Sequence, residues 1–333
     1  MFYKIFFNHD SLQENEVYQW NGRQFLVKKG IPRELNVYSE AQKQIKDAFG
    51  FKWSKRDTYE LEWSLAKNRD WILSRYFDSD EDKRVRFMQD INGDLFLDAG
   101  CGAAFSSLLL FGDYLKSVHY LGIDISESVD VARARMEQKD IKGEFIQADI
   151  TNLPVLEPCF NVIFSEGVLH HTYSTKESLR KMVALLHDGG LIMFYVYRKK
   201  GPIREFVDDY IRERIKGLSD REAWEKLKPL TNLGKILGDL NIQIEIDEDI
   251  DVLDIPKGKY NLQRFIYWHV AKMYYDRDYS LDEMNHANFD WYRPLYAHRQ
   301  TPEEVRSWCE EFGLQIVRLH AEEAGITVIA RKT

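Results

Sequence analysis

The chain has 333 residues, a formal net charge of −8 and 44% hydrophobic residues. This length is enough for a sizeable core in one large domain or two medium ones. The net acidity argues against a nucleic-acid substrate, which usually requires a basic face. No stretch approaches the roughly 20 apolar residues of a membrane span, so we expect no membrane partner.

The three cysteines, at positions 101, 159 and 309, are far apart and lack metal-ligand spacing. This pattern predicts neither a disulfide framework nor a metal site, and it fits a reducing cytoplasm. The sequence leaves the number of subunits open, with a homodimer as one option.

The N-terminal segment begins with a short apolar run, Met1 to Phe7, that meets polar residues at once. It is too short for a signal peptide, and we predict a first strand there. Asn21 and Gly22 lie between two strand-like runs, which is a strong hairpin signal because both turn positions need positive φ. Residues 40–90 are rich in aromatics at helical spacing. We therefore predict that residues 1–90 form a hairpin and a helical leader or lid.

A strand, a glycine turn and a helix follow. Leu95–Asp98 reads as a short buried strand, which runs into Gly100 and Gly102 and then into an apolar run of helical length, Ser107–Leu115. Glycines between a strand and a helix bring backbone N–H groups and a helix N-terminus close to a ligand.

Three more predicted strands end in or beside acidic residues. Val118–Ile123 leads into Asp124, Glu144–Ala148 into Asp149, and Phe160–Phe164 into Ser165 and Glu166. A helix over Thr175–His187, which Asp188-Gly-Gly190 is expected to stop, and a fifth strand over Leu191–Tyr197 complete the alternation. Alternating strands and helices predict a parallel sheet, so these acidic strand ends meet in one crevice.

The glycine turn does not favour a dinucleotide. The fingerprint G-x-G-x-x-G/A needs a small sixth residue, and this chain has Phe105 there. Asp98, just before the glycines, also suits a cationic ligand better than a pyrophosphate. A dehydrogenase is therefore disfavoured.

These motifs resemble those of the class I S-adenosylmethionine-dependent methyltransferases. The resemblance rests on Leu97-Asp-Ala-Gly-Cys-Gly102, Gly122-Ile-Asp-Ile-Ser126, Ala148-Asp-Ile-Thr-Asn-Leu-Pro154 and Phe160-Asn-Val-Ile-Phe-Ser-Glu-Gly-Val-Leu-His-His-Thr172. The last motif is similar to that of quinone-biosynthesis-type and natural-product-tailoring enzymes. The resemblance implies an α/β fold: a Rossmann-like, seven-stranded, mostly parallel sheet with an antiparallel last strand. Residues 91–197 would be its S-adenosylmethionine-binding core.

The resemblance also implies a cofactor, S-adenosylmethionine, and residues that bind it. Asp98 would face the cationic end, Asp124 the ribose, and Asp149 the adenine amino group. Lys29–Arg33 resembles the end of a zinc-ribbon-like leader, but no cysteine precedes position 101, so we expect no zinc. The predicted cofactor-binding residues are Asp98, Ala99, Gly100, Gly102, Asp124, Ile125, Asp149, Ile150 and Ser165.

The rest of the chain divides into a cap and a return to the sheet. Residues 198–290 are highly charged, with helical runs over Ile203–Ile215, Arg221–Leu230 and Leu262–Tyr274 and an acidic, solvated stretch between them. We predict an inserted helical cap that binds the acceptor. Residues 291–333 would complete the core: Thr301-Pro-Glu-Glu304 is a capping box, and two strands follow the helix that it starts.

Four residues are candidates for proton removal: His170, His171, Asp290 and His298. The two neighbouring histidines follow the fourth strand, and histidine titrates near neutral pH. The other two lie in an aromatic segment that also contains Tyr292 and Tyr296. Packing or hydrogen bonding is the alternative role for each candidate.

Together these features predict methyl transfer from S-adenosylmethionine to a hydroxyl or amine of a small molecule, such as a sugar nucleotide, lipid precursor or secondary metabolite. A nucleic-acid or protein methyltransferase is disfavoured by the charge and by the lack of an Asn/Asp-Pro-Pro-aromatic element; the fourth strand ends in Ser165-Glu-Gly167 instead. A non-catalytic scaffold or partner subunit is a third option. The retention of Asp124 and Asp149 argues against it.

Overall fold

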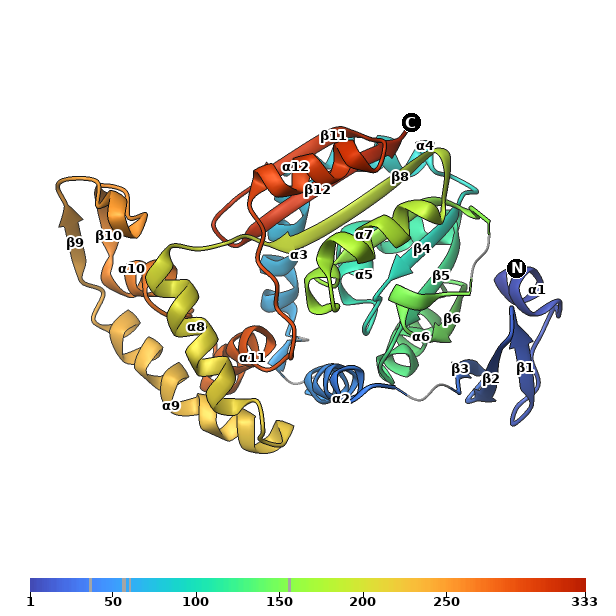
Figure 1. Ribbon diagram of the computed structural model, residues 1–333, viewed down its shortest axis with the longest axis horizontal. Helices are drawn as coiled ribbons and strands as arrows, with labels where there is room; N and C mark the ends of the chain where they lie inside the picture. Colours follow the sequence, from blue (N-terminus) through green and yellow to red (C-terminus); the bar gives the residue numbers. More distant parts are fainter. Residues whose placement is uncertain (36–37, 56–57, 60, 155–156) are drawn as a thin grey trace.

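The computed structural model describes residues 1–35, 38–55, 58–59, 61–154 and 157–333. In these residues a single sheet of ten strands forms the centre of the molecule (Figure 1). In spatial order its strands are β1 (Val17–Trp20), β2 (Arg23–Lys28), β3 (Ile31–Glu34), β6 (Gly143–Gln147), β5 (His119–Asp124), β4 (Leu95–Ala99), β7 (Phe160–Glu166), β8 (Leu186–Tyr197), β12 (Gly325–Lys332) and β11 (Leu314–Ala321).

The seven strands from β6 to β11 form the predicted sheet. Neighbours from β6 to β8 pair in parallel, whereas β12 runs antiparallel to both β8 and β11. The predicted Rossmann-like, mostly parallel sheet with an antiparallel last strand is therefore confirmed. The N-terminal segment adds three strands to this sheet, because Arg33 of β3 pairs in parallel with Gln147 of β6.

In the N-terminal segment the predicted hairpin is confirmed, and the predicted first strand is wrong. Asn21 and Gly22 connect β1 and β2 with φ values of 46° and 81°, as a tight antiparallel hairpin requires. The predicted first strand is instead a helix, α1 (Phe2–Phe7). Its Phe2 and Phe6 lie one turn apart and pack on Phe160, so their spacing suits a helical face as well as a strand.

Helices cover both faces of the sheet because neighbouring strand residues point to opposite sides. In β4, Leu97 and Ala99 are buried in the apolar cluster that includes α1, α7 (Thr175–Ala184) and α12 (Pro302–Glu311). Phe96 is buried in the opposite cluster. That second cluster includes residues of α3 (Glu62–Phe77), α4 (Glu81–Asp90), α5 (Phe105–Phe111) and α6 (Ser128–Gln138).

The segment after β8 forms a separate layer beside the sheet. It contains α8 (Pro202–Ile215), α9 (Asp220–Asp239), β9 (Gln243–Ile246), β10 (Gly258–Asn261), α10 (Leu262–His269) and α11 (Leu281–Tyr292). Figure 1 shows α8, α9 and α10 on one side of the core, with α11 nearer to the core and α2 (Glu40–Ser54) beside α11. A third apolar cluster, built from Trp224, Phe289 and Trp291, joins this layer to Tyr197 at the end of β8.

Several predicted boundaries are wrong. α7 ends at Ala184, and the predicted helix stop at Gly189 lies inside β8, where the pairing with β7 is irregular. α9 continues past Leu230 to Asp239 with Pro229 inside it, and α10 ends at His269 rather than Tyr274. α5 begins at Phe105 and ends at Phe111, before a 3-10 turn, Gly112–Ser117.

None of the helices in the described residues combines the length and the apolar character that a membrane crossing needs.

Candidate functional site

A cavity of about 840 Å³ opens where the parallel strands end. Gly100, Gly102, Asp124 and Asp149, which follow or close β4, β5 and β6, line one end of it. Residues of α2, α3, α8, α10 and α11 line the remainder. The volume is within the range of small-molecule sites, and the lining is rich in aromatic side chains, as is usual for such sites.

The glycine turn after β4 leaves no room for side chains. Gly100 and Gly102 have φ values of 81° and 51°. A Cβ atom on Gly100 would lie 2.3 Å from Val168 Cγ1, and one on Gly102 would lie 2.8 Å from Trp53 Nε1. Only glycine therefore lets the turn approach Val168 and Trp53 this closely.

Asp124 is held by the turn and by its own loop. Its Oδ2 accepts a hydrogen bond from the Gly102 N–H at 2.9 Å, and its Oδ1 accepts from the backbone N–H and the hydroxyl of Ser126 at 2.8 and 2.6 Å. Burial raises the pKa of this carboxyl, and these hydrogen bonds oppose the rise. A carboxylate has about four acceptor positions, so Asp124 has one left for a ligand.

Asp149 has a similar arrangement. Its Oδ1 accepts from the backbone N–H and the hydroxyl of Thr151, both at 2.8 Å, and its Oδ2 accepts from Gln42 Nε2 at 2.6 Å. The last bond connects the strand end to α2. Ile125 and Ile150, predicted to contact an adenine ring, both line the cavity.

Three predicted cofactor residues lie behind the cavity wall. Asp98 is buried and accepts a hydrogen bond from the Tyr120 hydroxyl at 2.6 Å; burial raises its pKa to about 7. The Ser165 hydroxyl donates to the Ala99 carbonyl at 2.9 Å, and both residues are fully buried. These three residues support the turn from below, whereas Gly100, Gly102, Asp124, Ile125, Asp149 and Ile150 reach the cavity.

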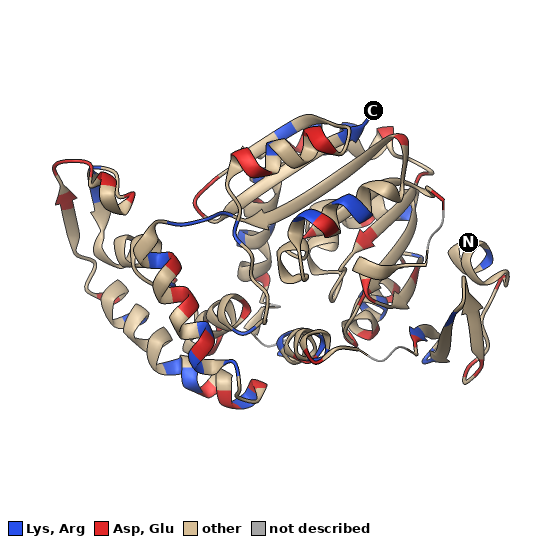
Figure 2. Cartoon of the chain, viewed as in Figure 1, with Lys and Arg blue, Asp and Glu red and all other residues tan. Residues whose placement is uncertain are grey.

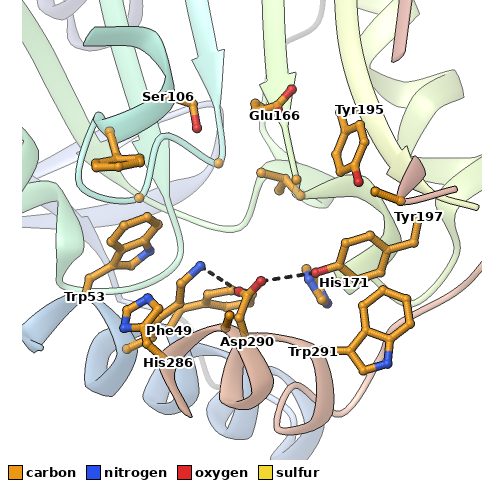
Figure 3. Close-up of a pocket in the computed structure, with 18 of the residues that line it drawn as sticks. Phe49, Trp53, Ser106, Glu166, His171, Tyr195, Tyr197, His286, Asp290 and Trp291 are labelled. Carbon is orange, nitrogen blue, oxygen red and sulfur yellow. Dashed lines mark hydrogen bonds and ion pairs between the residues drawn. The ribbon is translucent and has the colours of Figure 1, made fainter. Parts of the chain in front are cut away.

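An ion pair lies in the cavity between the core and the cap. Lys52 Nζ of α2 contacts Asp290 Oδ1 of α11 at 2.6 Å, and the Tyr197 hydroxyl donates to Asp290 Oδ2 at 3.2 Å (Figure 3). Burial alone would raise the pKa of Asp290, but Lys52 and Lys272 hold it below its usual range. Asp290 is therefore ionised and a weak base.

His171 lines the cavity with one ring nitrogen already bonded. Its Nδ1 is 2.7 Å from the Tyr296 carbonyl oxygen, which can only accept, so Nδ1 carries the proton. Burial lowers the pKa of His171 to about 4, and the ring is neutral at neutral pH. Its Nε2 has no hydrogen-bond partner among the described residues, and it can accept a proton.

The other two candidate histidines do not line the cavity. His170 is fully buried beside Tyr197, at 3.7 Å between ring centroids, and neither ring nitrogen has a partner among the described residues. Burial holds its pKa well below the usual value. His298 Nε2 donates to the Thr172 carbonyl at 3.0 Å, which ties the segment after α11 to the end of the 3-10 turn that follows β7. These contacts are those of packing and bracing residues.

Sequence reasoning missed a further imidazole and most of the cap lining. His286 of α11 lines the cavity; its Nδ1 is 2.7 Å from the Thr58 hydroxyl, and burial lowers its pKa to about 3. Trp53 also lines the cavity, and it lies in the segment that the sequence predicted to form a lid. No local pattern marks His286, because Thr58 is 228 positions away.

Glu166, at the end of β7, lines the cavity and is braced from behind. Arg75 pairs with its Oε1 at 2.5 Å, and the Tyr76 hydroxyl donates to its Oε2 at 2.6 Å. Arg75 is fully buried between Trp71 and Tyr195. No group of three or more His, Cys, Asp or Glu side chains in the described part of the chain could hold a metal ion.

Comparisons with known proteins agree with this geometry. A family model described as "Methyltransferase domain" matches residues 92–232. The chain is 38% identical over 133 residues to Probable tRNA methyltransferase 9B of Mus musculus, and 35% identical over 133 residues to its Homo sapiens counterpart. Each match covers 37% of this chain and 26% of the relative, so the chain matches about a quarter of the length of these proteins.

A solved structure of magnesium protoporphyrin IX methyltransferase from Synechocystis PCC 6803, with bound SAM, is similar over 90% of this chain and all of that chain, at 13% identity and a TM-score of 0.47. The matched family model, the strand order and the glycine turn between acidic strand ends agree on one assignment. The chain carries a methyltransferase domain over residues 92–232.

Proposed function

We propose that the chain transfers a methyl group from S-adenosylmethionine to a hydroxyl or amine of a small molecule bound under the cap. One observation carries this proposal: a single cavity runs from the acidic strand ends of the core into an aromatic, cap-lined region. A methyl donor and an acceptor must meet in one enclosed space for direct transfer. The two ends of this cavity suit those two ligands.

The residues at the core end fit the cofactor. The glycine turn offers close backbone approach, and Asp124 and Asp149 each keep about one acceptor position for a hydroxyl or amino group. Glu166 also lines the cavity at the end of β7, where Arg75 balances its charge. When bound, S-adenosylmethionine supplies the methyl group from its sulfonium centre.

His171 is our candidate for the group that removes the acceptor's proton. Its Nε2 lone pair is available, because the Tyr296 carbonyl fixes the proton on Nδ1. Asp290 is a weaker candidate, since its pairing with Lys52 lowers its basicity. We assign Asp290 a positioning role: it holds Lys52 and Tyr197 at the boundary between the core and the cap.

A tRNA acceptor is the second candidate, because the relatives quoted above are named as tRNA methyltransferases. Two observations favour a small molecule instead. The net charge is −8, and acidic and basic side chains lie intermixed along α8 and α9 rather than forming a basic face (Figure 2). The relatives also match only 37% of this chain, so most of it lies outside the match.

The experiment that separates the two is a labelling assay with radioactive S-adenosylmethionine. The protein is incubated with a small-molecule extract and, separately, with bulk tRNA from the same cells. We expect label in the small-molecule fraction, with the methylated product identified by mass spectrometry. Label in tRNA and none in the extract would contradict the proposal.

The role of His171 is tested on the acceptor that this assay identifies. His171→Gln should lower the rate of transfer by about a hundredfold or more, within the usual range for a general base, and leave S-adenosylhomocysteine affinity within about twofold. His298→Gln, outside the cavity, is the comparison. Full activity of His171→Gln together with a large loss in His298→Gln would move the role to His298.

A further inference from the structure

The cap end of the cavity has a group of basic side chains, Lys200, Arg204, Arg264 and Lys272, which we call the cationic cap wall. They come from the start of α8, from α10 and from the segment before α11. Aromatic rings lie among them: Tyr267, Trp268 and Trp291 line the same part of the cavity. Whether carboxylates of the chain pair with these basic side chains decides what charge the cavity presents to a ligand.

Lys272 has no counter-ion. No described residue accepts a hydrogen bond from its Nζ or forms an ion pair with it; the nearest aromatic contact is the Trp291 ring, with Nζ 4.8 Å from the ring centroid. The two acidic groups that act on Lys272 are Asp208 and Asp290. Both are already engaged, and Asp290 is paired with Lys52 at 2.6 Å.

The carboxylate of Asp208 accepts hydrogen bonds from several side chains. Its Oδ2 accepts from Arg204 Nε at 2.6 Å and from Trp291 Nε1 at 2.7 Å, and its Oδ1 accepts from the Tyr292 hydroxyl at 2.8 Å. The charges around Lys272 thus cancel in pairs, Arg204 with Asp208 and Lys52 with Asp290. The positive charge of Lys272 is therefore not balanced by a paired carboxylate.

Lys200 is a second surplus cation. Its Nζ donates to backbone carbonyls, those of Arg198 at 2.7 Å and Ala324 at 3.3 Å and that of Glu323, and to no carboxylate among the described residues. Carbonyl dipoles stabilise an ammonium only partly. Burial lowers the pKa of Lys200 to about 7 and that of Lys272 to about 8, as expected for cations without a partner.

Away from the strand ends, the carboxylates of Glu283, Glu322 and Glu323 also line the cavity. Glu283 caps the start of α11, with its Oε2 accepting from the Ser280 N–H at 2.6 Å, while its Oε1 has no partner among the described residues. Glu322 Oε1 accepts from Trp71 Nε1 at 2.9 Å, and Glu323 is exposed. None of the three is among the charges that act on Lys200 or Lys272.

We infer that the acceptor is a small organic anion, whose carboxylate, sulfonate or phosphate group binds Lys272 and Lys200 while its apolar part packs on Trp268 and Trp291. The anion supplies a counter-charge for two half-buried ammonium groups, and the aromatic rings cover its carbon skeleton. This inference rests on the proposed function in placing the acceptor at the cap end. It adds the charge class of that acceptor.

The test uses two fluorescent probes of nearly the same shape, 8-anilino-1-naphthalenesulfonate and its uncharged analogue N-phenyl-1-naphthylamine. Each is titrated into the full chain with and without saturating S-adenosylhomocysteine. We expect the sulfonate to bind more tightly than the uncharged probe. Lys272→Met should weaken the sulfonate about tenfold, the value of one charge-assisted hydrogen bond, and change the uncharged probe less than about twofold. Lys259→Met, at an exposed position in the same cap, should change neither.

Lys200→Met is the second variant, and it should show the same selective loss if Lys272→Met does not fold. Equal weakening of both probes, unchanged sulfonate binding in both variants, or a sulfonate that binds no tighter than the uncharged probe would overturn the inference. Failure of the proposed function looks different: S-adenosylhomocysteine would not bind, while the selective effect on the sulfonate would persist.

Discussion

The Gly102 N–H donates a hydrogen bond of 2.9 Å to Asp124 Oδ2, and this bond joins the glycine turn after β4 to the acidic end of β5. The two residues are 22 positions apart, and parallel pairing of β4 with β5 brings them together. The bond orients the carboxylate toward the cavity and fixes the turn. Cofactor binding should therefore depend on both residues.

Asp124→Ala should weaken the binding of S-adenosylhomocysteine by about tenfold or more, because it removes the free acceptor position and releases the turn. Calorimetric titration measures the affinity. Ser126→Ala is the control, since it removes one donor to the same carboxylate and should cost less than about threefold. An unchanged affinity of Asp124→Ala would contradict the assignment of this residue to the ribose.

Gly102→Ala should also impair cofactor binding, for a steric reason. The added Cβ would lie 2.8 Å from Trp53 Nε1, so the indole must move away from the turn. Gly93→Ala is a matched control: Gly93 also has positive φ, at 83°, but nothing lies within 4 Å of its added Cβ. Both variants should lose about 1 kcal/mol of stability from backbone strain, and only Gly102→Ala should lose affinity. Equal affinities would contradict this view of the turn.

Lys52 and Asp290 should be energetically coupled across the interface between α2 and α11. Their side chains are 14% and 26% exposed, so the ion pair is partly shielded from solvent. A double-mutant cycle with Lys52→Met and Asp290→Asn, followed by chemical denaturation, should give a coupling energy of about 1–2 kcal/mol. The exposed pair of Lys43 with Glu40, on the same helix α2, should give less than about 0.5 kcal/mol. Additive effects at Lys52 and Asp290 would contradict the coupling.

The raised pKa of Asp98 predicts a pH-dependent stability. The folded state binds this proton up to about pH 7, whereas the unfolded state releases it near 3.8. Between these values the folded state binds more protons, so the contribution of Asp98 to stability falls as the pH rises. Asp98→Asn removes the titration and leaves an acceptor for Tyr120.

The stability of Asp98→Asn relative to the wild type should therefore rise from pH 5 to pH 8, by on the order of 2 kcal/mol. Chemical denaturation of both proteins at the two pH values measures the difference. A difference that does not change with pH would mean that Asp98 is ionised throughout this range.

The core of the fold could be predicted from the sequence because its signals are local. The strands β4, β5 and β7 are largely apolar runs that lead into a glycine or an acid, and Asn21-Gly22 marks the hairpin between β1 and β2. A short apolar run does not by itself distinguish a strand from a helix, and for this reason α1 was predicted as a strand. Phe2 and Phe6 fit either period, and packing on Phe160 decides for the helix.

The boundaries that failed also depended on tertiary contacts. A Cβ atom on Gly190 would lie 2.8 Å from the His187 carbonyl oxygen and 3.0 Å from that of Asn161, so this glycine belongs to the irregular pairing of β8 with β7 rather than to a helix stop. In α9, the sequence predicted a helical run that ends at Leu230. The helix continues because Trp224, Leu227 and Thr231 on either side of the proline are buried.

Most of the cap end of the site was beyond sequence reasoning. Lys52 and Asp290 are 238 positions apart, and no periodic pattern links them. The two adjacent histidines looked equivalent in the sequence, yet only His171 reaches the cavity, because the 3-10 turn after β7 directs His170 into the core. Three-dimensional neighbours, rather than spacing, distinguish these residues.

Isothermal titration of the purified chain with S-adenosylhomocysteine and S-adenosylmethionine tests the central claim most directly, with NAD as the control ligand. We expect micromolar binding of both adenosyl compounds and none of NAD. Binding of NAD, or no binding of either adenosyl compound to folded protein, would contradict the account of the cavity as a methyl-transfer site.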